Sequence, residues 1–199
     1  MHHAHSKGGW KAGMSVYPDI TFITHYMERW YGYKRFLIVD LDAHQGNGHA
    51  RDHMNRIKYC IFDMYNHEIY PSDDYAKQGI TYDIDASLCP DDESYLAKLR
   101  EMLPIAFNEF NPDFVIYNAG TDCMNNDPLG HLQMTDQGII RRDEFVFKLA
   151  LEVHKVPIVM LLSGGFCHVN APCIAQSIAN LKTKFNLNTA REERKLLSD

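Results

Sequence analysis

The feature that most constrains this chain is a short apolar run that ends in a cluster of polar residues. Residues 36–39 are Phe-Leu-Ile-Val, which is typical of a buried parallel strand. Asp40, Asp42 and His44 follow at alternate positions, so an extended chain points them to the same side. Asp42 and His44 can therefore converge on one ion. Carboxylate and imidazole ligands without a thiolate indicate a catalytic zinc site, which keeps one position open for water.

The alternative interpretation of this stretch is a strand end whose acidic residues only cap the next helix. That interpretation requires neither the histidine nor the alternate spacing, and we therefore favour the metal site. The glycines of Gly46-Asn47-Gly48 allow the backbone to turn sharply after the cluster.

The rest of the chain alternates short apolar runs with stretches of helical periodicity. We expect strands at 35–41, 58–64, 80–84, 113–117 and 157–162, and helices at 16–30, 50–55, 91–107, 136–155 and 169–184. This alternation indicates an α/β fold with a mostly parallel sheet, in which ligands sit beyond the carboxyl ends of the strands. Polar loops at 40–48, 118–131 and 163–168 all follow strands, so we expect them to meet at one edge of the sheet.

A zinc site needs a third protein ligand, and the loop after residue 117 offers two candidates. Asp122 follows Ala119-Gly120, whereas Asp127 precedes Pro128 in a pair typical of turns. We therefore expect Asp122 to be the ligand and Asp127 to form a turn.

Two further features concern proton transfer. Asp40 lies one step back in the strand, where it is better placed to orient a catalytic histidine than to bind zinc. The tandem pair His2-His3 is either a general base with its partner or part of an unstructured terminus.

Composition excludes several classes of protein. The chain has 199 residues, the length of one domain, and a net charge of −6, which argues against a nucleic-acid groove. No apolar run approaches the ~18–20 residues needed to span a membrane. The five cysteines form no CxxC pair, which fits a reducing compartment and no disulfide framework.

Several motifs of the chain resemble those of the zinc-dependent histone deacetylases. They are DLDAHQGNG at 40–48, YN at 65–66, YP at 70–71, YNAGTD at 117–122, DPLG at 127–130 and SGG at 163–165. The sequences AHQGNG and NAGTD are similar to those of class IV of that family. The match runs in order from His2 to about Leu181. It implies the three-layer arginase/deacetylase α/β fold, with a mostly parallel sheet between helices.

The resemblance also implies roles for individual residues. Asp42, His44 and Asp122 would hold Zn²⁺. His2 and His3 match the tandem catalytic histidines of the family; Asp40 would fix the tautomer of His2, and Asn47 would lie behind His3.

Two further sites follow from the resemblance. Main-chain oxygens around Asp40, Asp42 and His44, together with Asp63, would form a structural K⁺ site. The channel for the acyl-lysine side chain would be lined by Gly13, Met14, Tyr70, Leu129, Gly164 and Gly165.

The chain departs from the family pattern at three points. Phe166 stands where the family has a tyrosine that holds the oxyanion, and losing one such donor typically costs ~10²–10³ in rate. Met14 replaces a channel phenylalanine, and the loop before it is about two residues longer. The family domain also has a long segment upstream of the histidine pair. We therefore expect an N-terminally truncated domain at 1–184, its C-terminal two-thirds, followed by a charged tail at 185–199.

The function implied is zinc-dependent hydrolysis of N6-acyl-lysine in histone tails or other proteins, with roles in chromatin regulation and transcription repression. Because of Phe166, the alternative is a weakened or inactive relative that binds acyl-lysine or a corepressor as a scaffold. A further alternative is a zinc amidohydrolase acting on a small molecule. The family implies the nucleus and cytoplasm as location, with neither direct nucleic-acid binding nor membrane association.

Overall fold

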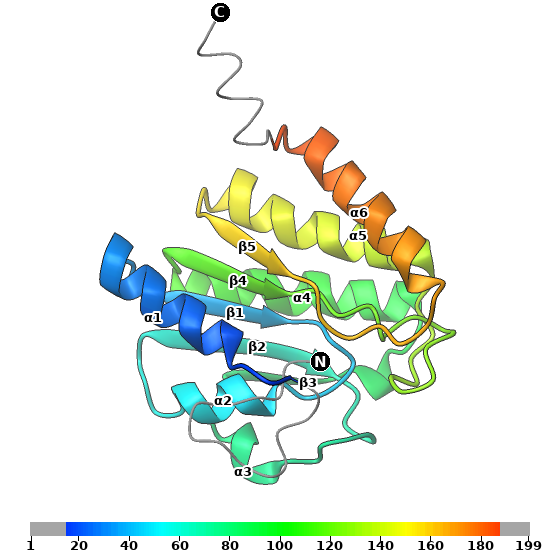
Figure 1. Cartoon of the computed structure of the whole chain (residues 1–199), viewed down its shortest axis with the longest axis horizontal. Helices are drawn as coiled ribbons and strands as arrows, with labels where there is room; N and C mark the ends of the chain where they lie inside the picture. The colour runs from blue at the N-terminus through cyan, green and yellow to red at the C-terminus, as the bar shows by residue number, and fades with distance from the viewer. Residues whose placement is uncertain (1–14, 188–199) are drawn as a thin grey trace, which may run out of the picture.

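The computed structural model of the protein describes residues 15–187 and contains a five-stranded sheet in which each strand pairs with its neighbours in parallel (Figure 1). The strand order is β3-β2-β1-β4-β5. The bounds are β1 (Phe36–Asp40), β2 (Tyr59–Tyr65), β3 (Tyr82–Asp85), β4 (Phe114–Asn118) and β5 (Ile158–Leu161). The predicted α/β fold with a mostly parallel sheet is confirmed.

Helices cover both faces of the sheet (Figure 1). One face carries α1 (Asp19–Tyr31), α2 (Asn47–His53) and α3 (Asp74–Lys77). The other carries α4 (Asp92–Phe110) and α5 (Asp136–Phe147), with α6 (Asn170–Lys184) lying along α5. Short helical turns at Ala86–Leu88 and Lys148–Val153 complete the helical elements among the residues described.

Two apolar cores follow from the alternation of side chains along β1. Leu37 and Val39 pack in the larger core, which also contains buried apolar residues of α4 and α5. Phe36 and Ile38 point the other way, into a smaller core that includes Ile20 of α1. All five residues of β1 are buried, as expected for a central strand covered on both faces.

Some helix ends differ from the predicted ones: α1 begins three residues later, at Asp19, and α4 ends three residues later, at Phe110. Three further differences concern other helices. The helix predicted over 136–155 is α-helical only to Phe147 and continues as a π-helical turn over Lys148–Val153. The segment predicted as a turn-rich loop contains α3, whose first turn is capped by Asp73 accepting a hydrogen bond from the Ala76 N–H. The helix predicted at 50–55 begins earlier, at Asn47.

The end of α6 agrees with the predicted boundary at residue 184, but the packed region extends slightly further. The Phe185 ring lies 5.9 Å from the Phe147 ring and packs against the larger core. Phe185, the first residue of the predicted charged tail, therefore packs against the helical domain.

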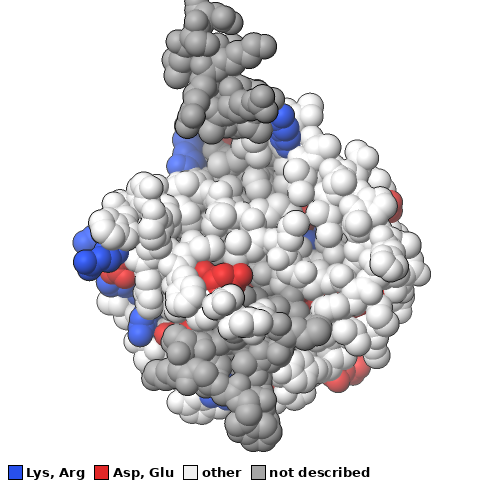
Figure 2. Space-filling model, viewed as in Figure 1, with Lys and Arg blue, Asp and Glu red and all other residues white. Residues whose placement is uncertain are grey.

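Helix α1 shows several large apolar side chains on the outside of the molecule. Phe22, Tyr26 and Trp30 are 53%, 55% and 67% exposed. Figure 2 shows that the face drawn is largely uncharged, with Lys and Arg mostly near its margins. Between residues 15 and 187, no helix is both long and apolar enough to cross a membrane.

Candidate metal centre

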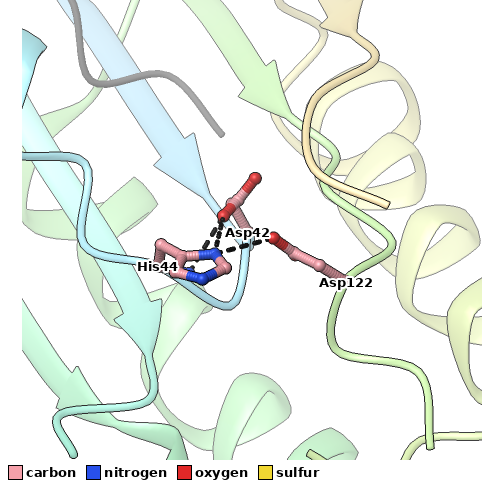
Figure 3. Close-up of side chains that lie close together, drawn as sticks. All are labelled: Asp42, His44 and Asp122. Carbon is pink, nitrogen blue, oxygen red and sulfur yellow. Dashed lines mark hydrogen bonds and ion pairs between the residues drawn. The ribbon is translucent and has the colours of Figure 1, made fainter. Parts of the chain in front are cut away.

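Three side chains converge just beyond the carboxyl ends of β1 and β4 (Figure 3). Asp42 and His44 follow β1, and Asp122 follows β4. The Nδ1 atom of His44 lies 2.8 Å from Oδ2 of Asp122 and 3.2 Å from Oδ1 of Asp42. One ligand atom from each residue lies within 4.8 Å of the others, and all three residues are buried. Asp42 and His44 thus lie close together, as their alternate spacing predicted, and Asp122 completes the group.

The backbone fixes the orientation of both carboxylates. Oδ1 of Asp42 accepts a hydrogen bond from the His44 N–H at 2.9 Å, and Oδ1 of Asp122 accepts one from the Ala43 N–H at 2.8 Å. The second oxygen of Asp42 accepts hydrogen bonds from the Ser163 hydroxyl at 2.9 Å and the Gly164 N–H at 2.8 Å. The loops after β1, β4 and β5 therefore meet at this site, as predicted.

Close approach of backbone to the carboxylates requires glycine at position 164. A Cβ atom there would lie 2.0 Å from Oδ2 of Asp122 and 2.6 Å from Oδ2 of Asp42. Gly120 is similarly restricted, since its Cβ would lie 2.6 Å from Oδ2 of Asp42.

The electrostatics of the cluster suit a divalent cation. Burial, and then the charge of Asp42, raise the pKa of Asp122 to about 7. Burial lowers the pKa of His44, but its hydrogen bonds to Asp122 and Asp42 outweigh that effect and raise it to about 9. Two buried carboxylates thus hold a proton on His44, a proton that a bound cation would replace, and the N and O donors of the cluster match those of zinc enzymes. The residues present fit the metal that the sequence predicted.

A second polar cluster lies directly behind the metal site. Oδ1 of Asp40 accepts hydrogen bonds from the Asn118 amide at 2.8 Å and the Asp42 N–H at 3.1 Å, and Oδ2 lies 3.5 Å from Nε2 of His49. Asp63 stands opposite Asp40 in the β1–β2 register and accepts a hydrogen bond from the Gly46 N–H at 2.9 Å. Burial, and then Asp42, raise the pKa of Asp40 to about 8.

Several predicted site residues lie outside the part of the chain that the structure describes. They are His2, His3, Gly13 and Met14. Their roles, and the partnership of Asp40 with His2, stay predictions. Asn47, predicted behind His3, donates a hydrogen bond to Oδ2 of Asp73 at 3.0 Å.

The residues predicted for the substrate channel differ in exposure. Tyr70 and Leu129 are exposed, at 46% and 42%, and Gly165 is exposed as well. Gly164 is buried against the ligand carboxylates instead.

Asp127 forms the turn that its Pro128 neighbour predicted. Its Oδ1 accepts hydrogen bonds from the N–H groups of Leu129 and Gly130 at 2.9 and 3.1 Å. Its Oδ2 accepts one from the Phe166 N–H at 2.7 Å, which fixes the backbone at that residue. The Phe166 ring lies 6.3 Å from the His44 ring, edge-on, so this residue borders the metal centre.

Four residues that support the site were not predicted from the sequence: Ser163, Asn118, His49 and Arg142. Arg142 supports it from α5, where its Nη1 atom donates a hydrogen bond to the Gly120 carbonyl oxygen at 2.7 Å. Ser163 and Asn118 each directly follow a predicted strand, and a polar residue at that position indicates a place at the site edge of the sheet. His49 and Arg142 lie on helices, where only the tertiary structure brings them to the site.

The fold and the site together define an α/β domain of the arginase/deacetylase type, with a carboxylate–imidazole metal centre at the carboxyl edge of its sheet. The histone deacetylase domain model matches residues 1–181 of the chain. The chain therefore belongs to the histone deacetylase family.

Individual relatives agree with this assignment. Histone deacetylase 2 of Arabidopsis thaliana is 41% identical over 191 residues, covering 96% of this chain and 49% of the relative. A probable deacetylase of Archaeoglobus fulgidus is 27% identical over 176 residues, covering 84% of this chain and 49% of the relative. The crystal structure of the HDA15 HD domain superposes with a TM-score of 0.75 at 25% identity, covering 90% of this chain and 52% of that one. The chain thus spans about half the length of these relatives.

Proposed function

We propose that the chain supplies the zinc centre of a deacylase that hydrolyses the amide of N6-acyl-lysine side chains. The observation that carries this proposal is the buried convergence of Asp42, His44 and Asp122 in a member of the histone deacetylase family. These three residues would hold Zn²⁺, which would supply Lewis acidity toward an amide carbonyl and toward a water molecule.

Residues of the chain have two further roles, which are to orient the metal ligand Asp42 and to transfer protons. Ser163 and Gly164 hold the outer oxygen of Asp42, which leaves its other oxygen facing His44. His3 takes the proton of the attacking water and later returns one to the lysine amine, while His2 is its partner. These two roles rest on the family resemblance.

Two further assignments rest on the same resemblance. Asp63 and main-chain oxygens around Asp40, Asp42 and His44 would form a K⁺ site. The proposal also includes class IV type and protein substrates such as histone tails. It further includes transcription repression, corepressor partners and a nuclear and cytoplasmic location.

One observation favours a second candidate function. Phe166 places a ring beside His44 but offers no hydroxyl for an oxyanion. A scaffold that binds acyl-lysine or a corepressor without efficient turnover fits that substitution.

The test measures turnover of acetyl-lysine and myristoyl-lysine peptides by the zinc-loaded chain, its Phe166→Tyr variant and its Asp42→Ala variant. We expect turnover by the chain, an increase of up to ~10²–10³ in Phe166→Tyr, and loss of both zinc and activity in Asp42→Ala. A chain that binds zinc and is inactive until Phe166 is replaced by tyrosine would support the scaffold function and contradict deacylase activity of the native chain. Bound zinc unchanged in Asp42→Ala would contradict the metal site.

A further inference from the structure

A buried arginine joins the two loops that carry the metal-ligand residues. Arg142 lies on α5 and is 0% exposed. Its Nη1 atom donates hydrogen bonds to the carbonyl oxygen of Leu41 at 3.0 Å and to that of Gly120 at 2.7 Å. The same atom lies 3.0 Å from Sγ of Cys123.

Both carbonyls belong to the segments that deliver the ligands. Leu41 directly precedes Asp42, and Gly120 lies two residues before Asp122. β1 ends at Asp40 and β4 at Asn118, so the carbonyls of Leu41 and Gly120 lie in the loops that follow these strands. Buried carbonyls need a donor, and the guanidinium supplies one to both loops at once.

The guanidinium is itself held in place by an anchored carboxylate. Oδ1 of Asp143 accepts hydrogen bonds from Nε and Nη2 of Arg142 at 3.0 and 2.9 Å. Asp143 also accepts hydrogen bonds from the hydroxyl of Tyr117, on β4, and from that of Ser177, on α6, the latter at 2.6 Å. A buried ion pair with additional hydrogen bonds fixes the direction of the side chain, although it contributes little net stability.

We propose that Arg142 is a positioning residue of the metal centre, which holds the Asp42 and Asp122 loops at the separation that a shared ion requires. This inference rests on the proposed zinc site and deepens it. The competing explanation is an ion pair that stabilises the core and has no effect on the ligands.

The experiment compares two variants with a matched control on the same helix. Arg142→Lys keeps the positive charge but loses the planar guanidinium, whose several N–H donors reach both loops and Asp143. Arg142→Met combined with Asp143→Leu removes the whole ion pair, so that no lone charge is buried. The control is Arg141→Met, because Arg141 is 42% exposed and pairs with Asp92 at 3.1 Å, away from the ligand loops.

Two quantities are measured in each folded variant. The first is zinc affinity, by competition with a chromophoric chelator. The second is hydrogen exchange of the Ala43 amide in the metal-free protein, because that amide donates to Oδ1 of Asp122 and reports on the spacing of the loops. Thermal unfolding midpoints separate these effects from a general loss of stability.

We expect zinc binding to weaken about 10–100-fold in both Arg142 variants, as for other residues that orient metal ligands, and Ala43 exchange to accelerate relative to Ile38. Arg141→Met keeps wild-type values of both quantities. Lower thermal unfolding midpoints with unchanged zinc affinity and unchanged Ala43 exchange would overturn the proposal. If the double variant does not fold, the Arg142→Lys variant decides between these outcomes. A wild-type chain that binds no zinc would refute the proposed function, while Ala43 exchange would still decide whether Arg142 positions the loops.

Discussion

The backbone N–H of Gly164 donates a hydrogen bond to Oδ2 of Asp42 at 2.8 Å, which joins two residues 122 positions apart. The Ser163 hydroxyl reaches the same oxygen at 2.9 Å. The loop after β5 therefore fixes a carboxylate that the loop after β1 supplies. With its outer oxygen occupied, Asp42 turns Oδ1 toward His44 at 3.2 Å.

The first prediction concerns Gly164→Ala. The new Cβ would meet Oδ2 of Asp122 at 2.0 Å and Oδ2 of Asp42 at 2.6 Å, so both ligand carboxylates must shift. We expect zinc affinity, measured by chelator competition, to fall at least 10–100-fold. Ser163→Ala removes the hydrogen bond from the Ser163 hydroxyl to Asp42 without a clash. The loss of zinc affinity should therefore be smaller in Ser163→Ala than in Gly164→Ala.

Gly79→Ala is the matched control for that prediction. Its Cβ would lie 2.2 Å from the carbonyl oxygen of Ala50, a comparable clash away from the ligand carboxylates. This variant should lower the thermal midpoint and leave zinc affinity of the folded protein unchanged. Equal losses of affinity in both glycine variants would show that the effect of Gly164→Ala is general destabilisation.

The sequence was sufficient to predict the strands, the parallel sheet and the edge where its polar loops meet, because these depend on local periodicity. The spacing of Asp42 and His44 also predicted their convergence. The hydrogen bonds of Ser163 and Arg142 were not predictable, since each depends on segments that only folding brings together. Arg142 in particular follows Arg141 on a helix, and the sequence alone does not show which of the two is buried.

The second prediction separates the two aspartates of the loop after β4. Asp122→Ala should abolish zinc binding, because it removes one of three ligands. Asp127→Ala should leave zinc affinity close to the wild-type value and lower the free energy of unfolding by about 1–3 kcal/mol, since three backbone N–H groups lose their acceptor. Zinc titration and urea unfolding measure the two quantities, and the reverse pattern would assign the third ligand to Asp127.

The third prediction concerns the cysteines, all of which are free. Burial raises the pKa of Cys60 and Cys173 to about 11 and that of Cys123 to about 12, and it also raises the pKa of Cys89. Thiolates react and thiols do not, so these four should be protected in the folded protein. Cys167 is less buried, and we expect it to be alkylated first by iodoacetamide, as peptide mapping would show. Early modification of Cys123 would contradict its burial in the larger core.

The last prediction is a loss of stability on acidification that originates at His53. The ring is buried and stacks on Tyr59 with centroids 3.9 Å apart. Burial lowers the pKa of His53 to about 3; Arg56 and His25 also lower it, and Asp52 opposes them. The unfolded chain binds a proton below about pH 6.5, whereas the folded chain does so only near pH 3, so His53 reduces stability as the pH falls through that interval.

One proton changes the free energy of unfolding by at most about 1.4 kcal/mol per pH unit. His53→Phe keeps a ring to stack on Tyr59 and removes the titrating group. Urea unfolding at several values between pH 7 and pH 5 should therefore show a shallower decline for the variant than for the wild-type chain. Parallel declines would mean that His53 is protonated in the folded protein, and that the buried ring tolerates the charge because Asp52 compensates it.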